Sequence, residues 1–166
     1  MDSSATETAV RIEPATAADL PQIMAVLETV NMHHVPSPEM PEFDLACAFV
    51  ARLVGAGGVA GAVVGVAGYK VLSPVAAKTT LLAVLPEVRG HGIGRLLQER
   101  RMDALAELGV RTLTTNADRP ETIAWYEKHF GYRRVGTLAK LHSFGREDIH
   151  EWTTLTTDLT RWRKAP

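Results

Sequence analysis

The sequence predicts a single domain of the mixed α/β (α+β) class. Apolar runs of strand length alternate with stretches in which apolar residues recur at helical spacing. The chain has 166 residues, of which 46% are hydrophobic, and this suits one domain with a substantial core. We expect the domain to occupy residues 9–160, between a disordered segment over residues 1–8 and a short basic tail over residues 161–166.

Seven strands and three helices are predicted from the period of the apolar residues and from the turn residues between them. The strands are expected over residues 10–13, 46–54, 61–72, 79–84, 111–116, 132–141 and 151–159. The helices are expected over residues 20–30, 92–108 and 119–130. Thr16 with Asp19, and Asp118 with Glu121, have the spacing of capping boxes, and Gly131 suits the end of the third helix. The residues of the second helix that are expected to face the core are Ile93, Leu96, Leu97, Leu105 and Leu108.

Composition argues against several classes of function. The net charge of −1 provides no general electrostatic attraction for nucleic acid or for a membrane surface. The first residues lack the pattern of a secretory signal, and the longest apolar stretch, residues 59–67, is too short to span a bilayer, so we expect a cytoplasmic protein. The single cysteine, Cys47, has no partner for an internal disulfide and is interpreted as a core residue rather than a nucleophile.

The segment that is most informative about function covers residues 84–97. An apolar strand ends at Pro86, a glycine-rich turn follows, and a helical pattern begins. The start of such a helix presents unpaired backbone N–H groups to a phosphate, and glycine lets the phosphate approach because it has no Cβ. The segment therefore predicts a pyrophosphate site. Its candidate residues are Arg89, Gly90, His91, Gly92, Ile93, Gly94 and Arg95.

Three pyrophosphate ligands compete for this turn. A P-loop requires G-x-x-x-x-G-K-[ST], which is absent, and a dinucleotide fingerprint requires G-x-G-x-x-G after a first strand, which the spacing here does not match. The third ligand is coenzyme A. The string Arg89-x-x-Gly92-x-Gly94, preceded by Val84-x-Pro86, resembles the acetyl-CoA signature of the GNAT acyltransferase superfamily.

A second motif, over residues 116–132, strengthens this resemblance. It is similar to the GNAT segment in which an asparagine ends a strand and the next helix carries a tyrosine, here Asn116 and Tyr126. Taken alone, Tyr126 is better interpreted as a core aromatic, because it shares a helical stripe with Ile123 and Phe130. Because Tyr126 occurs in a second motif at the expected place after the first one, the functional interpretation is favoured.

The resemblance extends over about residues 10–160 and implies the GNAT fold, a central, mixed but mostly antiparallel sheet of about seven strands with helices on both faces. It implies acetyl-CoA as co-substrate, no metal, and direct transfer of the acyl group to an amine in a ternary complex. It also implies that Leu82 and Val84 pair with the pantetheine arm, which Asn116 reaches as well. A strand N–H near Leu82 is expected to face the oxyanion. Tyr126 is then expected to protonate the departing thiolate as a general acid.

The general base and the acceptor remain open. An alkylamine of pKa ~10.4 is only ~0.04% neutral at pH ~7, so the amine must lose a proton before it attacks. Many family members carry a glutamate where this chain has Lys78. The alternative bases are His33, His34, Glu39, Glu42, His142 and Asp148. A water relay without a side-chain base is equally compatible with the sequence.

Two features outline the acceptor and the partners. Glu39, Glu42 and Asp44 make the first loop acidic, which favours a cationic amine. The candidate acceptor-binding residues are His33, His34, Glu39 and His142.

Two alternative functions stay open, namely a non-catalytic acyl-CoA-binding regulatory module and the same fold with another acyl donor. We expect a monomer or a homodimer, since exposed edges of the last hairpin would permit pairing.

Overall fold

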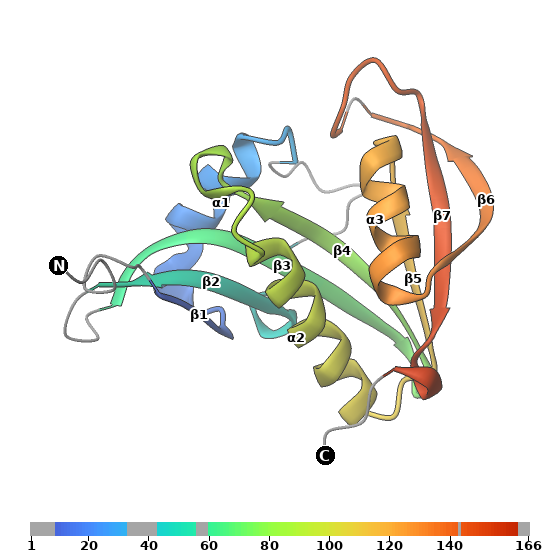
Figure 1. Ribbon diagram of the computed structural model, residues 1–166, viewed down its shortest axis with the longest axis horizontal. Helices are drawn as coiled ribbons and strands as arrows, with labels where there is room; N and C mark the ends of the chain where they lie inside the picture. Colours follow the sequence, from blue (N-terminus) through green and yellow to red (C-terminus); the bar gives the residue numbers. More distant parts are fainter. Residues whose placement is uncertain (1–8, 33–42, 56–59, 143, 163–166) are drawn as a thin grey trace, which may run out of the picture.

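Seven strands form one sheet in the order β1-β2-β3-β4-β5-β7-β6. A computed structural model describes residues 9–32, 43–55, 60–142 and 144–162 (Figure 1). The strands are β1 (Ala9–Pro14), β2 (Ala48–Val54), β3 (Ala60–Ser73), β4 (Ala76–Val84), β5 (Thr112–Ala117), β6 (Arg133–Ala139) and β7 (Glu151–Asp158). Neighbouring strands are antiparallel except for β4 and β5, which are parallel. The predicted mixed, mostly antiparallel sheet is therefore confirmed.

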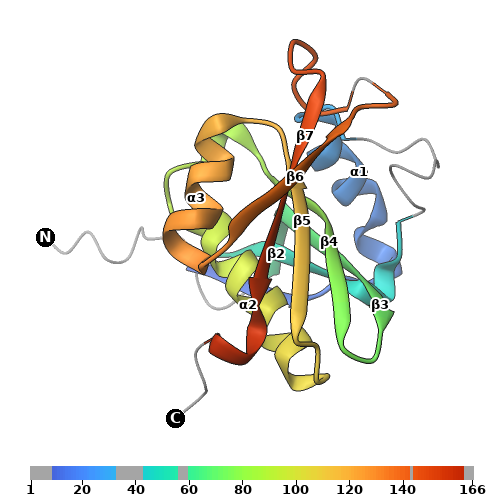
Figure 2. The same cartoon turned by 90° about the vertical axis from the view of Figure 1, so that its right-hand side faces the viewer.

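Helices cover both faces of this sheet, as the sequence predicted. Helix α1 (Leu20–Glu28) packs on one face, where Ile23 contacts the same buried cluster as Val66 of β3. Helices α2 (Ile93–Glu107) and α3 (Pro120–Phe130) cover the opposite face (Figure 2). They meet in a second cluster that includes Met102 of α2 and Ile123 of α3. Within the described residues, no helix is both long and apolar enough to cross a membrane.

The face that α2 turns to the sheet differs from the prediction. Ile93, Leu97 and Leu105 are buried as expected, but Leu96 is 42% exposed and Leu108 is 60% exposed, so those two assignments were wrong. The core positions that they were expected to fill are taken by the polar residues Gln98 and Arg101 and by Met102. The buried face of α2 includes Arg101, whose guanidinium donates to the carbonyls of Gly68 and Leu81 in the sheet, and Leu108 lies one residue beyond the end of the helix.

The two ends of the chain are described only in part. The segment predicted to be disordered, residues 1–8, lies outside the described residues, as do residues 163–166. Of the predicted basic tail, the structure describes Arg161 and Trp162. Trp162 packs against Phe130 with ring centroids 6.1 Å apart, and its indole N–H donates to Asp103 at 2.7 Å.

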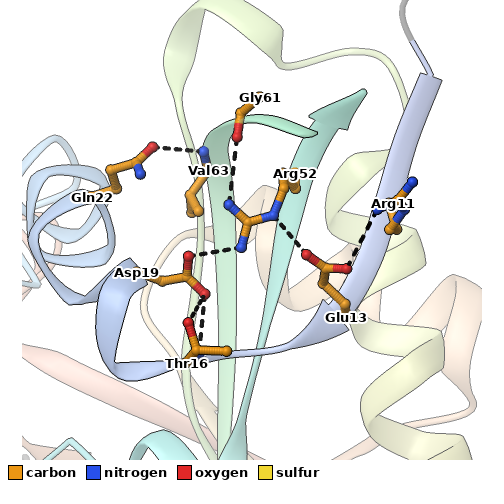
Figure 3. Close-up of polar contacts among 8 residues, drawn as sticks. All are labelled: Arg11, Glu13, Thr16, Asp19, Gln22, Arg52, Gly61 and Val63. Carbon is orange, nitrogen blue, oxygen red and sulfur yellow. Dashed lines mark hydrogen bonds and ion pairs between the residues drawn. The ribbon is translucent and has the colours of Figure 1, made fainter. Parts of the chain in front are cut away.

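A half-buried arginine ties β1, β2 and the entry to α1 together (Figure 3). The Arg52 guanidinium donates to Glu13 at 2.6 Å and to Asp19 at 2.7 Å. Asp19 also accepts from the backbone N–H and the hydroxyl of Thr16, so the predicted cap is present. Burial alone would raise the pKa of Asp19, but the hydrogen bonds from Arg52 and Thr16 outweigh it and hold this pKa below its ordinary value of 3.8.

Replacing Arg52 by methionine is expected to lower the free energy of unfolding by ~3 kcal/mol near neutral pH, because two carboxylates lose their cation. A depressed pKa gives stability that is present above the ordinary value and is lost as the pH falls below it. The difference between wild type and Arg52→Met should therefore shrink at about pH 3. Urea unfolding at both pH values measures it. In the matched control Arg134→Met, an exposed pair with Glu127 is lost, at a cost of ~0–1 kcal/mol.

Candidate active site

A cavity opens where β4 and β5 separate. The two strands pair only between Ala76–Lys78 and Thr112–Thr114. Beyond this point the two strands diverge (Figure 1). A hydrogen bond of 2.5 Å between the Thr79 and Thr115 hydroxyls lies at the start of the gap. The cavity between the strands has a volume of about 770 Å³ and is lined by residues of β4, β5, α2 and α3. The exposed backbone of a strand edge is a ready partner for an extended, amide-containing ligand.

The predicted phosphate turn forms one end of this cavity. Gly90 (φ 88°) and Gly92 (φ 77°) adopt left-handed backbone conformations that only glycine takes without strain. Helix α2 begins at Ile93 directly after Gly92, and the N–H groups of its first turn have no partners within the helix. Every candidate residue of the turn lines the cavity except His91. His91 stands between the two glycines and is exposed.

The Arg89 guanidinium, a predicted phosphate ligand, also forms a hydrogen bond within the protein. Its Nε donates to the carbonyl of Val84 at 3.2 Å, which fixes the side chain across the end of β4. Val84, an expected backbone partner of the pantetheine arm, thus already accepts a hydrogen bond from Arg89 through its carbonyl. Leu82, by contrast, lies on the stretch of β4 that does not pair with β5, and it lines the cavity together with Val84.

Tyr126 stands on the opposite wall, where it is both a core residue and a lining residue of the cavity. It is 3% exposed and belongs to the core cluster between α3 and the sheet, and it also lines the cavity. The rings of Trp125 and Tyr132 pack edge-on against it, each with a centroid distance of 5.0 Å. Its hydroxyl accepts a hydrogen bond from Arg101 at 3.4 Å. A phenol held in this way has little freedom to move.

Asn116 reaches the cavity from the end of β5, as expected. Its side-chain oxygen accepts a hydrogen bond of 2.6 Å from the hydroxyl of Thr154 on β7. This bond orients the amide group, so that its nitrogen is the donor that can meet a ligand carbonyl.

The far end of the cavity is built by the loop between β6 and β7. The ammonium group of Lys140 donates to Asp118 at 3.0 Å and to the carbonyls of Phe144 and Arg146, and it lies 4.5 Å from the ring centroid of Trp152. The predicted capping role of Asp118 is therefore wrong. The N-cap of α3 is the next residue, because the Asp118 carboxylate is taken by Lys140 and by the backbone N–H of Arg146.

A pair of hydrogen bonds closes this end against the loop that follows α1. The backbone N–H of Gly145 donates to the carbonyl of Asn31 at 3.0 Å, and the side chain of Asn31 donates back to the Gly145 carbonyl at 3.2 Å. Val30, Met32 and Trp152 line the cavity beside this contact. Apolar side chains thus line the cavity beside this contact, next to the Asp118 carboxylate that Lys140 holds.

None of the proposed bases and acceptor-binding residues is found on the described wall. His33, His34, Glu39 and Glu42 lie outside the described residues. His142 is described but does not line the cavity, and its ring stacks at 5.5 Å against Phe144. Asp148 is exposed and paired with Arg146 at 2.7 Å. No group of three potential metal ligands occurs among the described residues.

Lys78 does not take over the role of a missing glutamate. It is half-buried on β4 next to Lys70 of β3, and it does not line the cavity. Burial and the charge of Lys70 lower the pKa of Lys78. The described wall carries two carboxylates, those of Asp118 and Glu121, and no histidine.

Three residues that shape this site, namely Arg101, Lys140 and Trp152, were not predicted from the sequence. A signal for Arg101 was present, because it lies midway between Leu97 and Leu105 at intervals of four and so interrupts the apolar stripe of the helix. No comparable signal marks Lys140 or Trp152. Their contacts depend on how the loop between β6 and β7 folds back onto Asp118, which precedes α3.

Comparison with known proteins identifies the family. A sequence profile described as "Acetyltransferase (GNAT) domain" matches residues 45–134, over half of the chain, including the glycine turn and Tyr126. The chain belongs to the GNAT acetyltransferase family. Membership makes this GNAT domain an acyltransferase. No curated protein matches the chain in sequence.

Solved structures confirm the GNAT fold. Ard1 from Thermoplasma volcanium is similar with a TM-score of 0.71 and 18% identity, over 90% of this chain and 97% of that one. The ribosomal-protein-S18-alanine N-acetyltransferase from Escherichia coli has a TM-score of 0.67 and 20% identity, over 95% and 97% of the two chains. N-acetylglutamate synthase from Neisseria gonorrhoeae, complexed with coenzyme A and N-acetyl-glutamate, has a TM-score of 0.68 and 20% identity, over 93% of this chain but 36% of that one.

Proposed function

We propose that this GNAT domain transfers the acetyl group of acetyl-CoA to a primary amine of a small molecule or peptide, in a ternary complex. The observation that carries the proposal is one continuous cavity with the phosphate turn at one end and Tyr126 on its wall. Coenzyme A has the shape and charge that this cavity suits, with a diphosphate, an extended amide arm and a terminal sulfur.

Binding of the diphosphate is assigned to the start of α2. The N–H groups after Gly92 point along the helix axis, and the helix dipole adds partial positive charge there. Arg89 and Arg95 line the same end of the cavity and add two guanidinium groups. The pantetheine arm then follows the unpaired edge of β4 near Leu82, and the Asn116 amide meets it from β5.

Chemistry follows from this placement. The amine nitrogen attacks the thioester carbon, and an N–H near Leu82 stabilises the tetrahedral oxyanion. As the C–S bond breaks, its electron pair goes to sulfur, and the Tyr126 hydroxyl supplies the proton that converts the thiolate to a thiol. The apolar residues Val30, Met32 and Trp152 desolvate the incoming amine, which favours its neutral, nucleophilic form.

The first experiment measures thiol release from acetyl-CoA with a panel of primary amines. Amino acids and peptides lead the panel, because the names of the similar structures include an N-acetylglutamate synthase and a protein-alanine N-acetyltransferase. We expect turnover with at least one amine. Tight binding of CoA without turnover on any amine would support the regulatory module instead.

A thermal-shift series identifies the acyl donor. A ligand at about 100 times its Kd stabilises the folded protein by ~2.7 kcal/mol, so the preferred donor at equal concentration gives the largest rise in Tm. We expect acetyl-CoA to exceed succinyl-CoA and longer acyl-CoAs. A larger rise with one of these would assign a different donor to the same fold.

A further inference from the structure

The least expected residue of the molecule is Arg101, in the middle of α2. It is 0% exposed, and it also lines the cavity. Fully buried arginines are normally paired with carboxylates, because an isolated charge is costly to remove from water. None of the ion pairs formed between described residues includes Arg101. Such an arrangement needs an explanation beyond packing.

Every N–H of the guanidinium nevertheless has an oxygen partner. Nε and one terminal nitrogen donate to the side-chain oxygen of Gln98. The other terminal nitrogen donates to the carbonyls of Gly68 and Leu81, at 2.9 Å and 2.7 Å. The fifth donor is directed at the Tyr126 hydroxyl, at 3.4 Å. All of these acceptors are neutral, so the positive charge is hydrogen-bonded but not cancelled.

Two of the acceptors lie at an irregularity of the sheet. The register between β3 and β4 shifts after Gly68, which pairs with Leu81, while Tyr69 pairs with Thr79. Thr80 is thus the extra residue of a bulge, and the carbonyls of Gly68 and Leu81 turn toward α2. Arg101 therefore connects the bulged strand beside the proposed thioester site to the phenol on the opposite wall.

The bond to Tyr126 determines where its proton points. A guanidinium only donates hydrogen bonds, so the Tyr126 oxygen must accept and its own O–H must point elsewhere. Among the described residues, this O–H donates no hydrogen bond to another residue, and Tyr126 lines the cavity. The distance of 3.4 Å is long for a hydrogen bond, so Arg101 holds the Tyr126 oxygen less tightly than it holds its other acceptors.

We propose that Arg101 is the positioning residue of the acid step: it directs the Tyr126 O–H toward the departing sulfur and stabilises the phenolate that remains. This inference rests on the proposed role of Tyr126 as general acid. When the C–S bond breaks, sulfur takes the electron pair and the Tyr126 proton. The phenolate, held against the positive guanidinium, then regains a proton from solvent, to which the attacking nitrogen has lost one.

The test is a double-mutant cycle on kcat with the fastest amine of the panel. Arg101→Met should lower kcat by ~10- to 100-fold, while KM for acetyl-CoA and the Kd of CoA change by less than about threefold. In a Tyr126→Phe background, the same substitution should change kcat by less than about twofold. Arg101→Lys, which keeps the charge, should recover part of the rate. The matched control is Arg100→Met, one residue away on the exposed side over Phe49, and it should leave kcat unchanged.

Each outcome decides between the proposals. An equal loss of kcat with and without the Tyr126 hydroxyl would overturn the role of Arg101 and leave that of Tyr126 intact. If Tyr126→Phe alone is without effect, or if the wild type turns over no amine, the proposed function fails and this inference fails with it. If Arg101→Met does not fold, the cycle uses Arg101→Lys. Its ammonium does not span both the bulge and Tyr126, and kcat should fall ~3- to 10-fold, only when Tyr126 is present.

Discussion

Replacing Tyr126 by phenylalanine is expected to lower kcat for acetyl transfer by ~10²-fold or more. The substitution removes one oxygen and keeps the ring, whose edge-on contacts with Trp125 and Tyr132 hold the fold. The leaving thiolate then lacks its proton donor, whereas the groups assigned to the diphosphate are untouched. Steady-state kinetics with acetyl-CoA, together with calorimetric titration of CoA, should show a lower kcat at a Kd changed less than about threefold.

A neighbouring phenol provides the matched control. Tyr132 is buried as deeply as Tyr126 and accepts a hydrogen bond of 3.1 Å from Gln98, but it does not line the cavity. Burial raises the pKa of Tyr132 well above its ordinary value. Each Tyr→Phe change leaves one buried donor without its acceptor, so both should cost about 1–3 kcal/mol of stability. Only Tyr126→Phe should slow catalysis. Equal rate losses in the two variants would assign the effect to packing.

Gly92→Ala is expected to weaken CoA binding at least tenfold, ~1.4 kcal/mol or more. The added Cβ meets nothing within 4 Å in the protein, so the space that it enters is the approach to the first N–H groups of α2. A methyl group there holds a phosphate away from these donors. Calorimetric titration of CoA measures the loss of affinity.

Helix α2 supplies its own control for this substitution. Gly109 follows its other end with φ 89°, and a Cβ there also meets nothing within 4 Å. Placing alanine in the left-handed region costs about 1–2 kcal/mol at either end, so the two variants should lose similar stability. CoA affinity should fall in Gly92→Ala alone. Unchanged affinity in that variant would remove the diphosphate from the start of α2.

Local signals were sufficient for most of the fold. The glycines at 92 and 131 mark the start of α2 and the end of α3 because both carry positive φ angles that other residues avoid. Strand and helix periods located all seven strands and the three helices. The orientation of α2 was predicted less well, because helical spacing alone does not reveal that two carbonyls at a bulge in β4 accept hydrogen bonds from Arg101.

The site was predictable where chemistry is encoded in a contiguous segment. The glycine turn and Tyr126 lie in such segments, and the structure brings them to one cavity. The acceptor end was not predictable, because it depends on contacts between distant parts of the chain. Lys140 reaches Asp118, and Asn31 reaches Gly145 across more than a hundred residues. No local pattern encodes such pairs.

Because β4 and β5 pair through only three residue pairs, the sheet consists of two panels, β1 to β4 and β5 to β7, joined by a short parallel ladder. Helix α2 lies across both panels: Ile93 and Leu97 pack with β2 and β3, whereas Met102 and Leu105 pack with β5 and α3. Helix α2 therefore bridges the short ladder between the two panels, and its first turn follows directly after Gly92. A ligand held by the N–H groups of this first turn would bind the same helix that packs on both panels, so the proposed diphosphate site and the gap between β4 and β5 share one structural element.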